Sequence, residues 1–320
     1  MYRPIKVLAG SSHVGFAKEI CQYLNIELSE TKTIRFSNDN MMVRIEENVR
    51  GADVFVVQTS VYPVSNNIIE MLLMIDALKF ASAGRITAVL PYFPYVRSDK
   101  KDQPRISIAA RLMGELLVAA GCHRLLTMEL HSSQIQGFFS IPSDQLYATK
   151  IICDYFLKRD LSNYMLIAPD VGESKHLGKY ANILNLPIAI IDKRRLGNHE
   201  KILSTNLIGN VTGKDCLIID DEIASGGTIA TATKFLMDNG AKSVSAAVCH
   251  GVLSGSAMDT LENCPIKEIL VTNSIPLNHH KKISSKINQL SVAQLFAQAV
   301  SHIHTGQSVS LLFPEARVMD

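Results

Sequence analysis

The chain has 320 residues, of which 47% are hydrophobic and 19% are charged, and its formal net charge at pH 7 is +2. This composition excludes a disordered chain, and the small net charge argues against a large nucleic-acid-binding surface. The six cysteines are scattered and no apolar run reaches the roughly 18 residues of a membrane-spanning helix, so we expect a cytoplasmic protein with reduced thiols that binds neither membrane nor nucleic acid.

Apolar strands and helical segments alternate along the first half of the chain. The predicted strands are residues 5–9, 53–58, 85–90 and 124–130. The predicted helices are residues 15–24, 67–80 and a third that begins with Ser107 as its N-cap and ends at Ala120. Buried strands that alternate with helices of about ten or more residues indicate parallel β-α-β units.

Residues 94–106 interrupt this alternation with a charged segment that contains few apolar side chains. Its basic residues are Arg97, Lys100, Lys101 and Arg105, and its acidic residues are Asp99 and Asp102. We predict an exposed loop here. The charge pattern alone fits either a solvated surface or a lid over a polyphosphate.

The alternation restarts after Pro142. The predicted helices are residues 145–157, 173–184, 229–237, 257–262 and 291–302. The predicted strands are residues 164–168, 188–191, 217–219, 244–249 and 268–272. Two successive α/β halves of similar length indicate one duplicated domain type, with boundaries at 1–144 and 145–303.

Residues 217–228 carry the most informative local pattern in the chain. An apolar strand delivers two adjacent carboxylates, Asp220 and Asp221, to a turn of small residues that precedes a helix. The turn consists of Ala224, Ser225, Gly226, Gly227 and Thr228. Backbone N–H groups in such a turn can converge on an anion at the positive end of the helix dipole. The pattern predicts a sugar-phosphate site, although spacing alone fits an ordinary strand-to-helix turn equally well.

Polar side chains gather at the carboxyl ends of the predicted strands, where ligands bind in open α/β sheets. They are Arg97, His131, Asp170, Lys193, Arg195, Asp220 and Asp221. This set fits phosphate and magnesium chemistry, whereas we find no nucleophile with an adjacent base and no zinc-ligand spacing. Taken singly, His131 could be a hydrogen-bonded structural residue, Asp170 a turn cap, and residues 193–195 a solvated strand end.

Together these motifs resemble those of the phosphate-activated ribose-phosphate diphosphokinases, also called phosphoribosyl-pyrophosphate synthases. The resemblance covers essentially the whole chain, and its specificity comes from the number and order of the motifs. They include Asp53-Val54-Phe55-Val56, Pro91-Tyr92, Leu130-His131, Pro169-Asp170, Lys193-Arg194-Arg195, Asp220-Asp221, Val271-Thr272-Asn273-Ser274 and Gln307-Ser308-Val309-Ser310. The resemblance implies two tandem phosphoribosyltransferase-like domains, each a mainly parallel sheet flanked by helices. It also implies that the tail, residues 304–320, packs on the first domain.

The resemblance implies transfer of the diphosphoryl group of Mg-ATP to the C1 hydroxyl of ribose 5-phosphate, which gives 5-phosphoribosyl 1-diphosphate and AMP for nucleotide and amino-acid biosynthesis. It further implies Mg²⁺ as cofactor, inorganic phosphate as activator and a homo-oligomer, by resemblance a hexamer. The implied magnesium ligands are His131 and Asp170, and the implied catalytic residues are Lys193 and Arg195 on a mobile loop. The implied ATP contacts are Phe36, Asn38, Asn40, Arg97, Ser98, Asp99 and His131. Ribose 5-phosphate is assigned to Asp220, Asp221 and the turn Ala224 to Thr228, and regulation to Ser308 and Ser310 on a terminal strand.

Five positions depart from the family's usual pattern. Asn38 and Asn40 stand where relatives have acids that help to read the nucleotide across a subunit interface, and Ser98 replaces a glutamine. Glu173 lies where relatives have a paired glycine, and Ala224 stands where an aspartate usually opens the phosphate loop. The alternatives are a non-catalytic regulatory paralogue and a phosphoribosyltransferase, which would need only one such domain. We expect activity because the cations and carboxylates assigned to the reaction are retained together.

Overall fold

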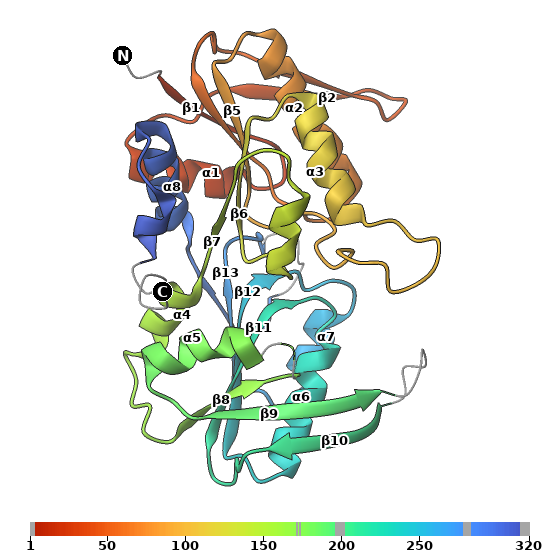
Figure 1. Cartoon of the computed structure of the whole chain (residues 1–320), viewed down its shortest axis with the longest axis vertical. Helices are drawn as coiled ribbons and strands as arrows, with labels where there is room; N and C mark the ends of the chain where they lie inside the picture. Colours follow the sequence, from red (N-terminus) through yellow and green to blue (C-terminus); the bar gives the residue numbers. More distant parts are fainter. Residues whose placement is uncertain (1–3, 171, 173, 196–201, 278–282, 314–320) are drawn as a thin grey trace. The chain divides into compact units, whose positions relative to one another are not determined.

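The computed structural model describes residues 4–170, 172, 174–195, 202–277 and 283–313, and it divides into two compact units (Figure 1). The first unit comprises Met1–Leu146, Ser274–Pro276 and Ser291–Asp320. The second comprises Tyr147–Asn273 and Leu277–Leu290. None of the helices in the described ranges is both long and apolar enough to cross a membrane.

A five-stranded parallel sheet in the order β1-β4-β5-β6-β7 forms the centre of the first unit. Its strands are β1 (Ile5–Ala9), β4 (Asp53–Val57), β5 (Arg85–Leu90), β6 (Arg124–Met128) and β7 (Ser143–Leu146). The helices are α1 (Val14–Leu24), α2 (Val64–Phe80), α3 (Ala109–Ala120) and α8 (Ala293–Thr305), with the short 3-10 helix η1 (Ser133–Phe138). Every residue of β4 is buried, which is expected of a strand covered on both faces.

Helices α1 and α8 pack together, and so do α2 and α3 (Figure 1). The ring centroids of Phe16 on α1 and Phe296 on α8 lie 5.2 Å apart in an edge-to-face arrangement. Helix α8 therefore belongs to the first unit, whereas the boundaries expected from the sequence assign it to the second domain. The sequence pattern identified the helix but gave no information on its packing partner.

A β-hairpin precedes β4 and was not predicted from the sequence. Strands β2 (Thr31–Arg35) and β3 (Met41–Ile45) pair antiparallel as a separate two-stranded sheet. Val43 and Ile45 of β3 pack against the apolar core of the first unit. The alternating apolar and polar residues on both sides of Asn38-Asp39-Asn40 were the signal that could have revealed it.

The second unit contains a seven-stranded sheet in the order β10-β9-β8-β11-β12-β13-β14. Its strands are β8 (Tyr164–Ala168), β9 (Ile188–Arg195), β10 (Ile202–Ile208), β11 (Asp215–Ile223), β12 (Ser243–Gly251), β13 (Glu268–Thr272) and β14 (Ile287–Leu290). All neighbours are parallel except β9 and β10. The helices are α4 (Thr149–Phe156), α5 (Ser174–Leu184), α6 (Gly227–Asp238) and α7 (Ala257–Glu262). The predicted α/β class with mainly parallel sheets is confirmed.

The order of strands differs between the two sheets in a way that matters for ligand binding. In the first sheet, the strands lie side by side in the order of the chain. In the second sheet, the chain moves from β8 to β9 on one side and then to β11 on the other side of β8. Such a reversal opens a crevice beyond the carboxyl ends of the two strands that flank it. Strands β8 and β11 therefore mark the expected ligand site of the second unit.

The structure corrects three local expectations. The predicted helix 145–157 begins instead as β7, and its helical part starts at Thr149. Strand β9 continues to Arg195 and does not end at Ile191, because β10 pairs with its second half. The tail forms the 3-10 helix η2 (Val309–Leu312) where a strand was expected.

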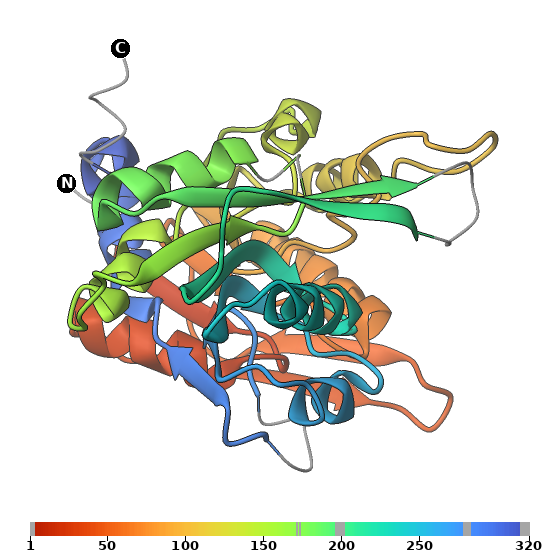
Figure 2. The same cartoon turned by 90° about the horizontal axis from the view of Figure 1, so that it is seen from below.

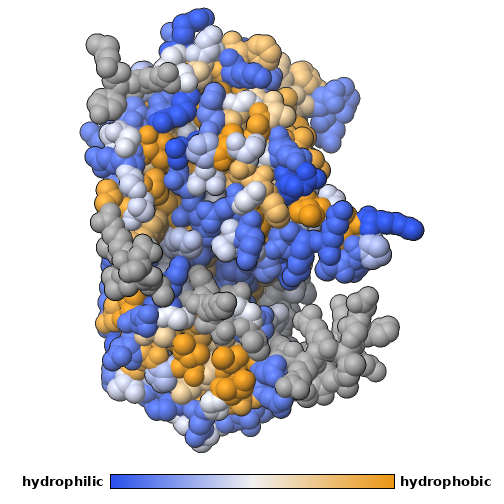
Figure 3. Space-filling view, in the orientation of Figure 1, coloured by the Kyte–Doolittle hydropathy of each residue, from blue (hydrophilic) through white to orange (hydrophobic). Residues whose placement is uncertain are grey.

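On the face in Figure 3, apolar side chains lie exposed over the β9–β10 ribbon, and Ile208 is 56% exposed.

Candidate functional site

Strand β11 extends beyond its neighbour β8 and carries the two predicted carboxylates on this extension. It pairs with β8 as far as Ile218, opposite Ile167, but it stays paired with β12 as far as Ile223. Asp220 and Asp221 therefore lie within the strand and not in the loop that the sequence suggested. The Oδ1 atom of Asp220 accepts a hydrogen bond from the N–H of Asp221 at 2.9 Å. Both residues therefore lie on the part of β11 that extends past β8, at the carboxyl edge of the second sheet.

The turn between β11 and α6 has the geometry of an anion-binding loop. Gly226 has φ +79°, a backbone conformation that disfavours any residue with a side chain. A Cβ on it would also lie 3.1 Å from Leu261 Cγ, which is a tight contact. The turn is tied to the next loop because Ser254 N–H donates to the Ala224 carbonyl at 2.9 Å. Within the part of the chain that the structure describes, the backbone N–H groups of Ser225 to Thr228 donate to no protein acceptor. Unpaired N–H groups at a helix N-terminus are donors for an anion.

Asp170 lies immediately after β8 and its side chain is exposed. A Cβ on Gly172 would lie 3.1 Å from the Oδ1 atom of Asp170, so the absence of a side chain at position 172 leaves room beside this carboxylate. Since β8 and β11 are neighbours, Asp170 and the extension of β11 belong to the same edge of the second sheet. Asp170, Asp220, Asp221 and the turn 224–228 therefore lie along the same edge of the second sheet.

Lys193 and Arg195 lie on strand β9, which pairs with β8 on one side and with β10 on the other. Lys193 is opposite Thr205 and Arg195 is opposite Ile202. The expectation of a loop at these two positions was therefore wrong for the backbone. Their side chains, and residues 196–201, lie outside the part of the chain that is described.

The first unit carries the residues expected to bind ATP, on separate elements. Phe36, Asn38 and Asn40 form the tip of the β2–β3 hairpin, where Phe36 is 48% exposed. The tip is held by a bond from Phe36 N–H to the Asn40 carbonyl at 2.9 Å. The Asn38 Oδ1 atom accepts a hydrogen bond from Asn40 N–H at 3.2 Å. Figures 1 and 2 both show the hairpin tip well away from the loop that follows β5.

That loop carries Arg97, Ser98 and Asp99, and it borders a cleft of about 340 Å³. The cleft is lined by Tyr92, Tyr95, Arg97, Ser98, Lys100 and Asp102, together with Val96 and Ile106. Arg97 is exposed, and the chain turns just before it because Tyr95 has φ +56°. The basic and hydroxyl groups at this cleft could bind a phosphorylated ligand.

His131 follows β6 and is exposed. No cluster of three or more His, Cys, Asp or Glu side chains suited to a metal ion occurs within the described ranges. This is compatible with Mg²⁺, which keeps several waters and is usually bound through one or two carboxylates and substrate phosphates. The exposed carboxylate of Asp170 fits that kind of partial protein ligation, whereas the imidazole of His131 is a less usual ligand for Mg²⁺.

The tail residues expected to be regulatory lie around η2. The Ser308 and Ser310 hydroxyl oxygens are 2.7 Å apart, and both residues are exposed. The Nδ1 atom of His302 on α8 lies 2.9 Å from the Ser308 carbonyl oxygen. The two serines are thus held close together at the end of α8.

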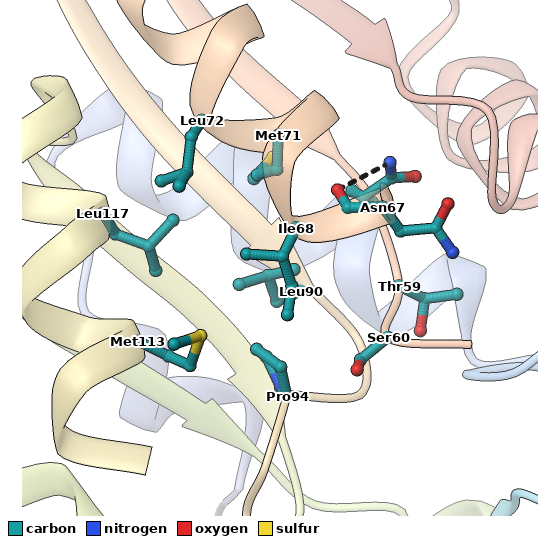
Figure 4. A pocket seen from close by; sticks show the side chains of 11 residues that line it. Thr59, Ser60, Asn67, Ile68, Met71, Leu72, Leu90, Pro94, Met113 and Leu117 are labelled. Atoms are coloured by element: carbon teal, nitrogen blue, oxygen red, sulfur yellow. Dashed lines mark hydrogen bonds between the residues drawn. The ribbon is translucent and has the colours of Figure 1, made fainter. Parts of the chain in front are cut away.

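A small apolar pocket lies between α2 and α3, and its lining differs from the polar residues at the sheet edges. Figure 4 shows Ile68, Met71 and Leu72 of α2 facing Met113 and Leu117 of α3, with Leu90 and Pro94 below. Its free volume is about 20 Å³, which is the space of about one water molecule. This pocket is too small for a nucleotide or a sugar phosphate.

Two family models match the chain. Residues 5–121 match the N-terminal domain of ribose phosphate pyrophosphokinase, and residues 196–314 match the phosphoribosyl synthetase-associated domain. Curated relatives of similar length match nearly end to end. A ribose-phosphate pyrophosphokinase of Caldanaerobacter subterraneus is 45% identical over 311 residues, which cover 97% of this chain and 98% of the relative. The ribose-phosphate pyrophosphokinase of Deinococcus radiodurans is 45% identical over 314 residues, with the same shares.

A solved structure agrees with these sequence matches. The crystal structure of phosphoribosylpyrophosphate synthetase from Mycobacterium smegmatis has a TM-score of 0.89 and 37% sequence identity to this chain. The match covers 95% of this chain and 100% of the chain in that structure. The similarity therefore extends over both units, including the sheet in which β8 and β11 are neighbours.

Proposed function

The chain belongs to the ribose-phosphate pyrophosphokinase family, and on this premise we propose that its two units divide the substrates, with ATP bound by the first and ribose 5-phosphate by the second. The chain is a diphosphokinase that transfers the diphosphoryl group of ATP to the C1 hydroxyl of ribose 5-phosphate and releases AMP. The main support for assigning ribose 5-phosphate to the second unit is the run of N–H groups from Ser225 to Thr228, which have no acceptor in the described chain and lie next to the reversal of strand order.

In the second unit, the turn 224–228 binds the 5-phosphate. Its backbone donors and the dipole of α6 attract a dianion, and the exposed hydroxyls of Ser225 and Thr228 add donors of their own. Asp220 and Asp221 accept hydrogen bonds from the ribose hydroxyls, since they lie on the strand that leads into the turn. Ala224 offers no carboxylate, so phosphate binding rests on the backbone and the two hydroxyls.

In the first unit, Arg97 pairs with the phosphates of ATP, with Ser98 at the same cleft and Asp99 next in the chain. Phe36 offers a ring for stacking on adenine, and the amides of Asn38 and Asn40 can both donate and accept hydrogen bonds with the base. The hairpin tip and the Arg97 loop lie apart within one chain (Figures 1 and 2). We therefore assign the tip to the nucleotide of a second copy, in a homo-oligomer that is a hexamer by resemblance.

The family generally needs Mg²⁺, and we assign His131 and Asp170 to magnesium, each in its own unit. Magnesium supplies charge neutralisation on the transferring diphosphoryl group. Lys193 and Arg195 add positive charge to that group, because diphosphoryl transfer depends on positioning and charge stabilisation more than on covalent catalysis. Ser308 and Ser310 are assigned to the phosphate activator. All six cysteines are free and buried, which fits a reducing, cytoplasmic location.

The test is AMP formation from ATP by the purified full-length chain. AMP should form only when ribose 5-phosphate and Mg²⁺ are both present, and a non-catalytic subunit would form none. Lys193→Ala should lower kcat strongly without loss of stability, because it removes a contact made in the transition state. Lys267→Ala, on an exposed lysine of the same unit, is the matched control and should leave kcat unchanged. Normal kcat in Lys193→Ala would contradict the catalytic assignment.

A further inference from the structure

Ser98 has its polar groups in use within the protein, although it stands beside Arg97 at the ATP cleft. Its hydroxyl donates to the Ser107 carbonyl at 3.1 Å and accepts from Ala109 N–H at 3.3 Å. Its carbonyl accepts from Ala110 N–H at 3.2 Å, and its own N–H donates to the Tyr95 carbonyl at 2.9 Å. Four hydrogen bonds thus join Ser98 to the turn before it and to the start of α3 after it.

These bonds close the charged loop at its base. Residues 99–107 leave the fold at Ser98 and return to it at Ser107, so the Ser98–Ser107 bond joins the two ends of the loop. Ser98 also supplies the capping oxygen at the start of α3, a role that the sequence assigned to Ser107. The charged side chains at positions 100, 101 and 105 are exposed, so they do not anchor the loop by packing, and we expect the closure at Ser98 to matter for its order.

The same bonds restrict the backbone of Arg97. The residue before it, Val96, is 2% exposed and packs in the apolar core of the first unit. The residue after it is Ser98, fixed to α3. Arg97 therefore projects from a backbone that is held on both sides, although its own side chain is exposed. A long arginine side chain loses less entropy on binding when its base is fixed in place.

We infer that Ser98 is a positioning residue: through its bonds to Ser107 and to the N-terminus of α3, it holds Arg97 and the charged loop in place for ATP. This inference rests on the proposed role of Arg97 in ATP binding. It reassigns Ser98 from a nucleotide contact to a link within the protein. A glutamine, expected here in relatives, has no hydroxyl at the Cβ and could not make the same short bridge.

The experiment compares Ser98→Ala, Ser98→Thr and the matched control Ser107→Ala in the full-length protein. The side chain of Ser107 is exposed, and it is the backbone carbonyl of this residue that accepts the bond from Ser98. Limited trypsin digestion without ligand should cut Ser98→Ala several-fold faster after Lys100, Lys101 or Arg105. The KM for ATP should rise by about tenfold, the effect of about 1.4 kcal/mol, while kcat and the KM for ribose 5-phosphate stay within about twofold. Ser98→Thr keeps a hydroxyl and should restore both properties, and Ser107→Ala should behave as wild type.

Each contrary result is informative. If Ser98→Ala raises the KM for ATP without faster digestion, Ser98 contacts the nucleotide directly and the inference is wrong. If digestion is faster but the KM is unchanged, the link does not position Arg97 and the inference is also wrong. Arg97→Ala tests the proposed function separately: an unchanged KM for ATP there would refute the contact of Arg97 with ATP, while the digestion of Ser98→Ala would still decide whether the link orders the loop.

Discussion

Two loops of this protein share one local design but differ in what occupies their backbone donors. In each, a buried parallel strand leads through small residues into a helix: Gly10 to Ser12 between β1 and α1, and Ala224 to Thr228 between β11 and α6. In the first loop, Ser11 N–H donates to Glu70 Oε2 at 3.0 Å, and Ser12 N–H donates to Gln58 Oε1 at 3.0 Å. In the second, the described chain provides no acceptor for the corresponding N–H groups.

The difference shows that a strand, a small-residue turn and a helix do not by themselves make a phosphate site. The first loop is filled by the protein, because the carboxylate of Glu70 and the amide of Gln58 occupy the positions that a ligand's oxygens would take. Glu70 is 1% exposed and also accepts from Ser11 Oγ at 2.5 Å, Thr33 Oγ1 at 2.6 Å and Gln58 Nε2 at 2.8 Å. Of the two loops, only the second has these N–H donors without an acceptor in the described chain, which leaves them available for the proposed 5-phosphate.

The largest effect should come from placing a carboxylate in the second loop, as Glu70 is placed in the first. In Thr228→Glu, a negative charge lies at the site proposed for the 5-phosphate, and like charges at such short range cost several kcal/mol. We expect the KM for ribose 5-phosphate to rise more than about a hundredfold, with the KM for ATP little changed. Thr228→Gln, of the same size but neutral, is the control and should show a much smaller increase. Equal effects of the two variants would refute the anion site.

Removing the carboxylate from the first loop should lower stability and not substrate affinity. Glu70→Ala leaves the donors of Ser11 and Thr33 without their acceptor, removes one of the two acceptors of Gln58 Nε2, and opens a cavity beside α2. We expect the free energy of unfolding to fall by about 3 kcal/mol in urea denaturation. Glu70→Gln retains an acceptor oxygen and should lose less. A stability within about 0.5 kcal/mol of wild type in Glu70→Ala would show that the first loop does not depend on this internal carboxylate.

The sequence predicted the elements at both loops but not the contrast between them. Regular apolar strands and helices set the α/β class, and the adjacent Asp220 and Asp221 marked the second loop. The occupancy of the first loop depends on Glu70, 59 residues away along the chain, which no local pattern connects with Ser11. The same reason explains why the continuation of β9 was missed: residues 192–195 are polar, and only pairing with β10 makes them a strand. The resemblance assigns Ser98 to the nucleotide, whereas its bonds to Ser107 and Ala109 arise from the closure of the loop, which no local sequence pattern reveals.

Alanine substitutions of one glycine in each loop should differ in their effect on stability, by a smaller amount than the loss expected in Glu70→Ala. A Cβ on Gly10 would lie 2.5 Å from Gln58 Cδ, and Gln58 cannot move freely because it is 1% exposed and bonded to Ser12 and Glu70. A Cβ on Gly227 would meet only Ser225 Oγ, at 3.8 Å. Gly10→Ala should therefore cost about 1–2 kcal/mol of stability by overpacking, whereas Gly227→Ala should change it by less than about 0.5 kcal/mol. Thermal unfolding of both variants measures the difference, and equal losses would mean that the first loop is not filled as described.

The smallest effect should come from pH, through Glu268, a buried carboxylate of the second unit that lies on β13 and not in the phosphate loop. Burial raises the pKa of Glu268, but hydrogen bonds from Arg159 and Tyr155 and the charge of Arg159 outweigh it, so the pKa lies below its ordinary value of 4.5. A lowered carboxyl pKa contributes stability that is present above pH 4.5 and is lost as pH falls through the folded-state value. Wild type should therefore exceed Glu268→Gln in stability at pH 6, by about 1 kcal/mol or less for a partly exposed pair, and the gap should narrow towards pH 3. Urea denaturation at these pH values tests this. A gap that stays constant with pH would mean that Arg159 supports Glu268 by packing and not by charge. A rise in the KM for ribose 5-phosphate in Glu268→Gln would contradict the separation of this carboxylate from the phosphate loop.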